Sequence, residues 1–222
     1  MARNLINIES ISKQYGVAPI LDSISLGIAE SERIGVVGRN GGGKSTLMKV
    51  IAGLEPADSG RVTKSTWTKV GYLNQSDSAS STTSVRDLIV GSKKTHEWAS
   101  VSGVREILSG LFGGYSAEIL DRPYSSLSGG EKRRVGIAGL LIEPLDLILL
   151  DEPTNHLDLD SITWLEELLN GFQGSVVLIT HDRSFLDAVC TQIVELDRGI
   201  LRTYPGNFSA YQVQKEQELA AE

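Results

Sequence analysis

A glycine-rich stretch at residues 38–46 constrains the fold of this chain more than any other feature. It reads Gly-Arg-Asn-Gly-Gly-Gly-Lys-Ser-Thr and matches the phosphate-binding loop pattern G-x-x-x-x-G-K-[ST], with Gly38, Gly43, Lys44 and Ser45 at the required positions. The glycines let successive backbone N–H groups point at one anion, the lysine adds a point charge for the β- and γ-phosphates, and the serine offers a hydroxyl to Mg²⁺. The pattern therefore predicts a nucleotide-phosphate site.

The residues on either side of this stretch strengthen the prediction. Ile34–Val37 is a short apolar run typical of a buried strand, and Thr46–Ala52 is typical of a helix. The positive end of such a helix faces the same phosphates. A glycine-rich loop by itself is more often an ordinary turn, but here strand, loop and helix follow in the order that a phosphate-binding loop requires.

The composition fits one large domain, or one core with subdomains. The chain has 222 residues, of which 41% are hydrophobic, and this is enough to bury a sizeable core. No run is long enough to span a membrane and Met1–Asn4 shows no apolar signal segment, so we expect a cytoplasmic protein. The net charge of −7 argues against a chain that wraps nucleic acid by itself, although it is compatible with a small basic patch.

Strands are predicted on both sides of the glycine-rich stretch. Asn4–Ile8 and Ile20–Ile28 alternate polar and apolar residues, which is typical of half-buried strands, and the second suggests antiparallel pairing. Turns are expected at Lys13–Gly16 and at Asp58–Gly60, and Val70–Leu73 is a further short strand.

Helices are predicted in the middle of the chain. Ser84–Val90 begins at a Ser/Thr cap, Val104–Leu111 has helical spacing, and Ser128 opens a helix that runs to about Ile142. Helices inserted between strands indicate a small subdomain beside the nucleotide core.

Two buried strands later in the chain end in polar residues. Leu147–Leu150 is followed by Asp151 and Glu152, and Val176–Thr180 is followed by His181. The alternation of strands and helices predicts an α/β fold with a mostly parallel sheet, and ligands bind at the carboxyl ends of such strands. We therefore expect these side chains to gather around the glycine-rich loop.

The residue types at these strand ends suit phosphate chemistry. Asp151 is typical of an aspartate that holds Mg²⁺, and Glu152 can act as a general base toward an attacking water. The two acids could instead cap the next segment, but Pro153 follows and a pair of adjacent acids is an unusual cap. His181 could be a satisfied core histidine, although its position favours a γ-phosphate sensor.

The chain resembles an ATP-binding cassette (ABC) ATPase, because seven motifs follow one another in the order of that family. They are the stacking aromatic Tyr15, the Walker A loop Gly38–Ser45, the Q-loop residue Gln75, the signature Leu127–Glu131, the Walker B strand Leu147–Asp151, the D-loop Asn155–Asp158 and the switch histidine His181. The resemblance implies an ABC-type nucleotide-binding domain of the P-loop NTPase class, with an antiparallel β subdomain and a small helical subdomain. This domain is expected to cover residues 1–211, with the helical subdomain at about 76–143.

The same resemblance implies roles for individual residues. Catalysis of ATP hydrolysis is expected to involve Glu152, His181, Lys44 and Gln75, and Mg²⁺ to be held by Ser45, Gln75 and Asp151. The residues expected to bind ATP are Tyr15, Gly38, Arg39, Asn40, Gly41, Gly42, Gly43, Lys44, Ser45, Thr46, Ser128, Gly129 and Gly130.

One branch of the family is indicated. Ser128–Glu131, Asp151–Asp158 and especially Tyr204–Tyr211 resemble the ABC-F class, close to its Uup-like members. That class implies two cassettes in one chain and, for many members, action on ribosomes. We therefore expect composite ATP sites formed with a second cassette, in the same parent chain or as a homodimer, a ribosome or ribosomal RNA partner, and no membrane.

Only one cassette is present in this sequence. It resembles an N-terminal half, and the polar residues 212–222 read as the start of an interdomain linker helix that continues beyond Glu222. About fifty residues separate Gln75 from Ser128, whereas ABC-F proteins often carry a long helical arm there. The alternative is the ATPase subunit of a membrane transporter, which the Asn155–Asp158 loop and the Tyr204–Tyr211 segment favour less.

Overall fold

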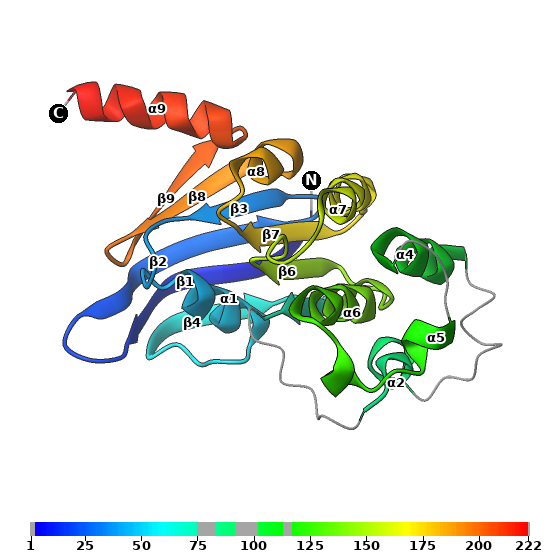
Figure 1. Ribbon diagram of the computed structural model, residues 1–222. Helices are drawn as coiled ribbons and strands as arrows, with labels where there is room; N and C mark the ends of the chain where they lie inside the picture. The colour runs from blue at the N-terminus through cyan, green and yellow to red at the C-terminus, as the bar shows by residue number, and fades with distance from the viewer. Residues whose placement is uncertain (1–2, 75–82, 92–101, 113–116, 222) are drawn as a thin grey trace. The chain divides into compact units, whose positions relative to one another are not determined.

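The computed structural model divides the chain into two compact units (Figure 1). It describes residues 3–74, 83–91, 102–112 and 117–221. The first unit contains Met1–Tyr72, Leu145–Glu152 and Leu169–Glu222, and the second contains Leu73–Pro144 and Pro153–Leu168.

An antiparallel sheet forms one layer of the first unit. Its strands, in the order β2-β1-β4, are β1 (Asn4–Gln14), β2 (Pro19–Ala29) and β4 (Ser59–Lys64). The register of β1 against β2 shifts between Ile8 and Ile11, where Ser10 has a left-handed backbone (φ 48°). This bulge lets the strand continue to Gln14. The predicted strand end at Ile8 is therefore wrong, and so is the predicted turn at Lys13 and Gln14.

The turn predicted at Asp58–Gly60 is also wrong in part. Ser59 and Gly60 already belong to β4, and Ser59 pairs with Ser12 of β1. The side chains of β4 are mostly exposed, so the sequence carries no alternating pattern there.

A six-stranded sheet forms the other layer, in the order β5-β6-β7-β3-β8-β9. The strands are β3 (Arg33–Val37), β5 (Val70–Leu73), β6 (Leu147–Asp151), β7 (Ser175–Ile179), β8 (Gln192–Asp197) and β9 (Ile200–Pro205). β3 pairs in parallel with β7 and β8, β6 pairs in parallel with β7, and β9 is antiparallel to β8. Every residue of β6 and β7 is buried, which confirms the predicted α/β fold with a mostly parallel sheet.

Helix α1 (Lys44–Ala52) packs into the core between the two sheets. It buries Leu47, Met48, Val50 and Ile51 in an apolar cluster that also contains residues of β1, β2, β3, β6, β7 and β8. Gly53 ends the helix in a left-handed conformation (φ 73°).

Two further helices complete the first unit. Helix α8 (Arg183–Val189) begins at the cap residue Asp182, and helix α9 (Phe208–Ala221) closes the described chain. Asp187 of α8 accepts hydrogen bonds from the backbone N–H (2.7 Å) and the hydroxyl of Ser209, in the first turn of α9. The polar residues from 212 onward therefore lie in a helix whose first turn is attached to α8.

The second unit is helical. Its elements are α2 (Val85–Val90), α4 (Ser102–Phe112), α5 (Ala117–Leu120), a 3₁₀ turn at Tyr124–Ser126, α6 (Gly129–Leu141) and most of α7 (Leu159–Gly171). Helices α2 and α4 pack against α6, and the Ser84 side chain caps α2 as predicted. In the described parts of the chain, no helix combines the length and the apolar character needed to cross a bilayer.

Candidate functional site

The glycine-rich loop connects the end of β3 to the start of α1. Gly38 has φ 146°, and a Cβ placed on it would lie 2.1 Å from the backbone oxygen of Leu196 in β8, so only glycine fits there. Gly43 is the N-cap of α1 in a left-handed conformation (φ 96°), and no side chain caps this helix end. The first N–H groups of α1 therefore remain available to an anion.

Lys44 lies over this loop. Its ammonium donates hydrogen bonds to the backbone oxygens of Gly38 (2.9 Å) and Arg39 (3.0 Å). Burial lowers the pKa of Lys44, while the nearby carboxylates of Glu152 and Asp151 oppose this shift. The first unit thus brings the lysine and both acids into one electrostatic environment.

Asp151 is the last residue of strand β6, and Glu152 follows it directly. Asp151 is 1% exposed, and the Tyr72 hydroxyl lies 3.5 Å from its Oδ2. Glu152 has a left-handed backbone (φ 53°), which costs a non-glycine residue about 1 kcal/mol or more. Its backbone N–H donates to the oxygen of Ile179 in β7 at 2.8 Å, and this bond holds the residue at the strand end.

Glu152 and His181 form a pair. Glu152 Oε1 lies 3.4 Å from His181 Nε2, and the backbone N–H of His181 donates to Glu152 Oε2 at 3.4 Å. Burial raises the pKa of the Glu152 carboxyl, and the neighbouring His181 partly offsets this rise. A carboxylate with a raised pKa, oriented by a second group, suits the acceptance of a proton.

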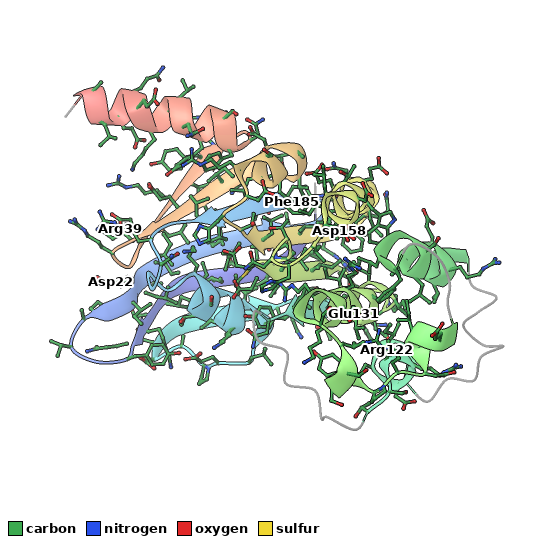
Figure 2. All side chains as sticks on the ribbon, in the orientation of Figure 1. Asp22, Arg39, Arg122, Glu131, Asp158 and Phe185 are labelled. Atoms are coloured by element: carbon green, nitrogen blue, oxygen red, sulfur yellow. The ribbon has the colours of Figure 1, made fainter. Side chains whose placement is uncertain are left out.

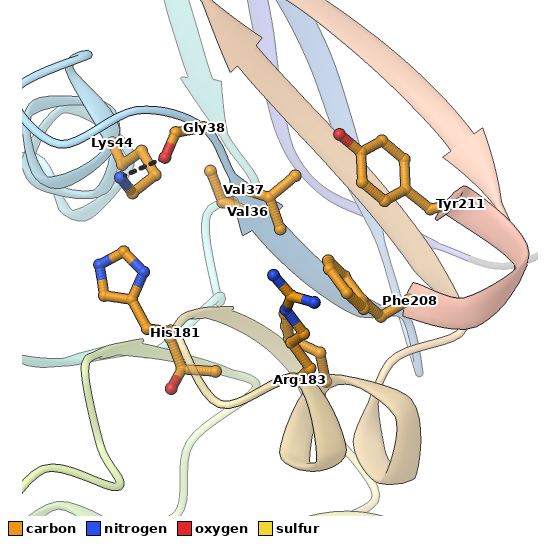
Figure 3. A pocket seen from close by; sticks show the side chains of 10 residues that line it. Val36, Val37, Gly38, Lys44, His181, Arg183, Phe208 and Tyr211 are labelled. Carbon is orange, nitrogen blue, oxygen red and sulfur yellow. Dashed lines mark hydrogen bonds between the residues drawn. The ribbon is translucent and has the colours of Figure 1, made fainter. Parts of the chain in front are cut away.

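His181 of this pair also lines a cavity of about 270 Å³ within the first unit (Figure 3). Lys44 and His181 border it from the loop side, and Phe208 and Tyr211 border it from α9. Arg183 also lines it, with its guanidinium 5.9 Å from the centre of the Phe208 ring. The motif pattern did not predict Arg183, Phe208 or Tyr211 as site residues, because their arrival depends on how α8 and α9 pack.

Tyr15 lies in the connection between β1 and β2. It is 58% exposed, and the Lys13 ammonium is 5.5 Å from the centre of its ring. Ile20 of the same hairpin lies beside the loop, because a Cβ on Gly43 would be 2.3 Å from Ile20 Cγ2. The connection that carries Tyr15 thus belongs to a hairpin that touches the glycine-rich loop.

The signature residues lie in the second unit. Ser128 is the N-cap of α6, and it forms a capping box with Glu131. A Cβ on Gly130 would lie 2.6 Å from the backbone oxygen of His156, so the start of α6 packs against the loop after β6. The structure gives the arrangement of Ser128, Gly129 and Gly130 within this unit only, and Gln75 lies outside the described residues.

Oxygen donors suited to Mg²⁺ are present. No cluster of three His, Cys, Asp or Glu side chains occurs among the residues that the structure describes. Mg²⁺ at nucleotide sites commonly uses one or two protein oxygens together with phosphates and water. The buried carboxylate of Asp151 and the hydroxyl of Ser45 are oxygen donors of this type.

Known proteins are similar over most of the chain. A 36% identity over 99% of this chain relates it to the uncharacterized ABC transporter ATP-binding protein YfmR of Bacillus subtilis, and 34% identity over 100% relates it to the energy-dependent translational throttle protein EttA of Mycobacterium tuberculosis. EttA of Escherichia coli is 37% identical over 91% of the chain. The chain covers 40%, 46% and 43% of these relatives, and so spans less than half of their length.

Solved structures share the fold. The RNase-L Inhibitor matches with a TM-score of 0.77 and 28% identity over 93% of this chain and 40% of its own. An archaeal ribosome recycling factor, solved in complex with a ribosomal stalk protein, matches with a TM-score of 0.78 and the same identity and coverage. The model of the family described as ABC transporter matches residues 21–155, from β2 through the signature to the loop after β6. Since this match spans more than half of the sequence, the chain belongs to the ABC transporter family of ATPases, and its relatives are of the ABC-F type.

Proposed function

We propose that this chain is an ABC-F-type cassette that hydrolyses ATP. The observation that carries the proposal is the pair of Glu152 and His181 beside Lys44 in the first unit. Glu152 is 6% exposed, lies 3.4 Å from His181 Nε2 and has a raised pKa. A proton acceptor next to a phosphate-binding loop is the arrangement that hydrolysis of a terminal phosphate needs.

Each side chain has a role in this proposal. The loop of residues 38–46 and the start of α1 bind the phosphates through N–H groups, and Lys44 adds positive charge. Glu152 accepts the proton of the attacking water, while His181 orients Glu152 and contacts the γ-phosphate. Tyr15 stacks on the adenine.

Mg²⁺ is proposed to be held by Ser45, Asp151 and Gln75. It supplies charge that offsets the negative phosphate oxygens. The position of Asp151 at the carboxyl end of the buried strand β6 supports this role, because ligands bind at the carboxyl ends of such strands.

The hydrolytic site is proposed to be composite. Ser128, Gly129 and Gly130, at the start of α6, complete the site of a second cassette, which is either part of the same parent chain or a second copy of this one. The N-terminus of α6 is suited to this role because it presents N–H groups and a serine hydroxyl to an anion. The relatives are more than twice as long as this chain, which leaves room for a second cassette.

Residues 1–211 are proposed to form this cassette, with residues 212–222 as the start of a linker helix. Ribosome action is proposed because relatives at 34–37% identity are named as a translational throttle protein. The alternative of a membrane transporter subunit is not favoured by these relatives. The protein is proposed to act in the cytoplasm.

The test is Glu152→Gln, which keeps the size of the side chain but removes the base. Steady-state hydrolysis should fall on the order of 10²- to 10⁴-fold, while the ATP dissociation constant stays within about threefold. Lys44→Ala should instead weaken ATP binding itself. Near-normal turnover of Glu152→Gln would show that Glu152 is not the base. Cosedimentation of Glu152→Gln with ribosomes, with and without ATP, tests the ribosome proposal separately.

A further inference from the structure

The start of helix α6 carries a negative charge at the point where it is proposed to meet a phosphate. In the capping box, the Ser128 backbone N–H donates to Glu131 Oε2 at 2.7 Å, and the Glu131 N–H donates to Ser128 Oγ at 3.3 Å. Ser128 Oγ accepts this bond, and its hydroxyl also interacts with the Glu131 carboxylate, so serine and glutamate form one connected group at the helix start. The N–H groups of Gly129 and Gly130 belong to the first turn, which has no partners within a helix.

This arrangement organises the donors but places a carboxylate one hydrogen bond away from Ser128. The backbone N–H and the hydroxyl of Ser128, together with Arg122, lower the pKa of Glu131, so the group is ionised near neutral pH. An uncompensated carboxylate at this position would repel the terminal phosphate of ATP. The helix end therefore needs a nearby positive charge.

Arg122 supplies that charge. Its guanidinium donates to Glu131 Oε1 at 2.6 Å and to the backbone oxygen of Ser126 at 3.0 Å (Figure 2). The side chains of Arg122 and Glu131 are 35% and 27% exposed, so solvent screens this pair only in part. The backbone oxygen of Arg122 accepts from the N–H of Val85, which attaches this segment to the start of α2.

We propose that Arg122 is a positioning residue for ATP hydrolysis: it neutralises Glu131 and holds the turn at Ser126, so that Ser128 and the start of α6 can receive the γ-phosphate bound by a second cassette. This inference rests on the composite site of the proposed function. It assigns Arg122 an effect in trans, on the nucleotide of the partner cassette, and none on nucleotide bound to its own loop.

The first experiment measures the coupling between Arg122 and Glu131. Arg122→Met should lower kcat about tenfold, which is the loss expected for a weakened cap and a partly exposed ion pair together. The same substitution in the Glu131→Gln background should cost less than about twofold, because the neutral amide needs no compensating charge. ATP binding by the isolated chain should not change in any of these variants.

A matched control uses the neighbouring ion pair. Arg86 donates at 2.6 Å to Asp121, the residue before Arg122, and neither member of this pair belongs to the signature turn. Arg86→Met removes a pair of the same type, and hydrolysis should stay within about twofold of wild type. Thermal unfolding of all variants shows whether a loss of activity is a loss of folding.

The second experiment is mixing. Arg122→Met mixed with Lys44→Ala should regain activity, because one composite site of the mixed dimer carries both changes and the other carries neither. Arg122→Met mixed with Ser128→Arg should regain nothing, because both sites then have a damaged signature. Lys44→Ala mixed with Ser128→Arg is the reference for composite sites.

The outcomes separate the two proposals. Two results overturn the role of Arg122 but leave the composite site intact. The first is recovery in the reference mixture together with an equal loss of kcat for Arg122→Met in the wild-type and Glu131→Gln backgrounds. The second is recovery of activity when Arg122→Met is mixed with Ser128→Arg. Full activity of Arg122→Met has the same meaning. No recovery in the reference mixture overturns a composite site between two copies of this chain, and the effect of Arg122 in trans between such copies is then rejected with it.

Discussion

Tyr211→Phe should detach part of helix α9 from the sheet below it. The Tyr211 hydroxyl donates to Glu195 Oε1 at 2.9 Å, and the Glu195 side chain is only 13% exposed. The same carboxylate also accepts from Lys215 at 2.8 Å, and it shares the Tyr204 hydroxyl, at 3.3 Å, with Glu218, whose Oε2 lies 2.9 Å from that hydroxyl. These four residues, with Glu218, form what we call the Glu195 cluster, which joins β8 and β9 to α9.

The magnitude follows from what the substitution removes and leaves. A hydrogen bond to a charged group contributes about 1.5–3 kcal/mol. The substitution keeps the ring, which lies edge-on to Tyr204 with centroids 5.0 Å apart, and the carboxylate keeps two other donors. We therefore expect the low end of the range, ~1.5 kcal/mol, and a decrease in Tm of roughly 3–6 °C.

The loss should depend on pH. Burial alone would raise the pKa of Glu195, but the hydrogen bonds from Lys215, Tyr211 and Tyr204 outweigh it and lower the pKa below its ordinary value of 4.5. A lowered pKa in the folded state means that the ionised cluster stabilises the protein above about pH 4.5, and that this contribution disappears as the pH falls through the folded-state pKa. The difference between Tyr211→Phe and wild type should therefore be largest near neutral pH and smaller at pH 3.5.

Urea unfolding at pH 7 and pH 3.5 measures this difference, and hydrogen exchange at pH 7 locates it in residues 208–221. Tyr15→Phe is the control, because Tyr15 is 58% exposed and lies outside the cluster. An equal loss of stability at both pH values, or no loss at pH 7, would refute the role assigned to the carboxylate. Faster exchange spread evenly over the chain would refute its location.

Two further predictions concern the proposed nucleotide sites. Gly130→Ala places a Cβ 2.6 Å from the backbone oxygen of His156, so the signature turn has to move; hydrolysis should fall on the order of 100-fold, while ATP binding by the chain's own loop is kept. Gly171→Ala is the control, because its Cβ meets no atom within 4 Å. Unchanged turnover of Gly130→Ala would contradict the prediction. Tyr15→Ala should weaken ATP binding about tenfold, whereas Tyr15→Phe should keep it, because a ring face and not a hydroxyl stacks on a base. Calorimetry measures the dissociation constants, and equal values for both variants would show that Tyr15 has no role in ATP binding.

The parallel core could be predicted from sequence because its strands are buried on both faces. Leu147–Leu150 and Val176–Ile179 are unbroken apolar runs, and burial on both faces explains why they show no alternation. Once such strands are assigned, Asp151, Glu152 and His181 fall at their ends. The geometry within the first unit brings Glu152 and His181 to 3.4 Å, as the topology leads one to expect.

The antiparallel layer could not be predicted in the same detail. The bulge near Ser10 shifts the alternation of β1 by one residue, so the alternating pattern is interrupted after Ile8 although the strand continues. Strand β4 has almost no buried side chain and therefore no pattern at all. Helix α8 has a cap signal at Asp182, but seven residues are too few for a clear helical period.

The cavity wall formed by α9 could not be predicted from the sequence either. Phe208 and Tyr211 line the cavity because Asp187 holds the first turn of α9 and the Glu195 cluster holds the next turns. Both attachments join residues far apart in the sequence, and no local sequence pattern predicts them. Residue motifs locate chemistry on single strands, whereas this wall is a product of tertiary packing.

The hydrogen bond between Asp187 and Ser209 makes α8 the attachment point of α9. Helix α8 begins directly after His181 and Asp182, and Asp187 in its last turn binds the first turn of α9. Helix α9 has 14 residues and is therefore about 21 Å long. Helices α8 and α9 thus connect the segment that follows His181 to the last described residues, through a bond between residues 22 positions apart in the sequence.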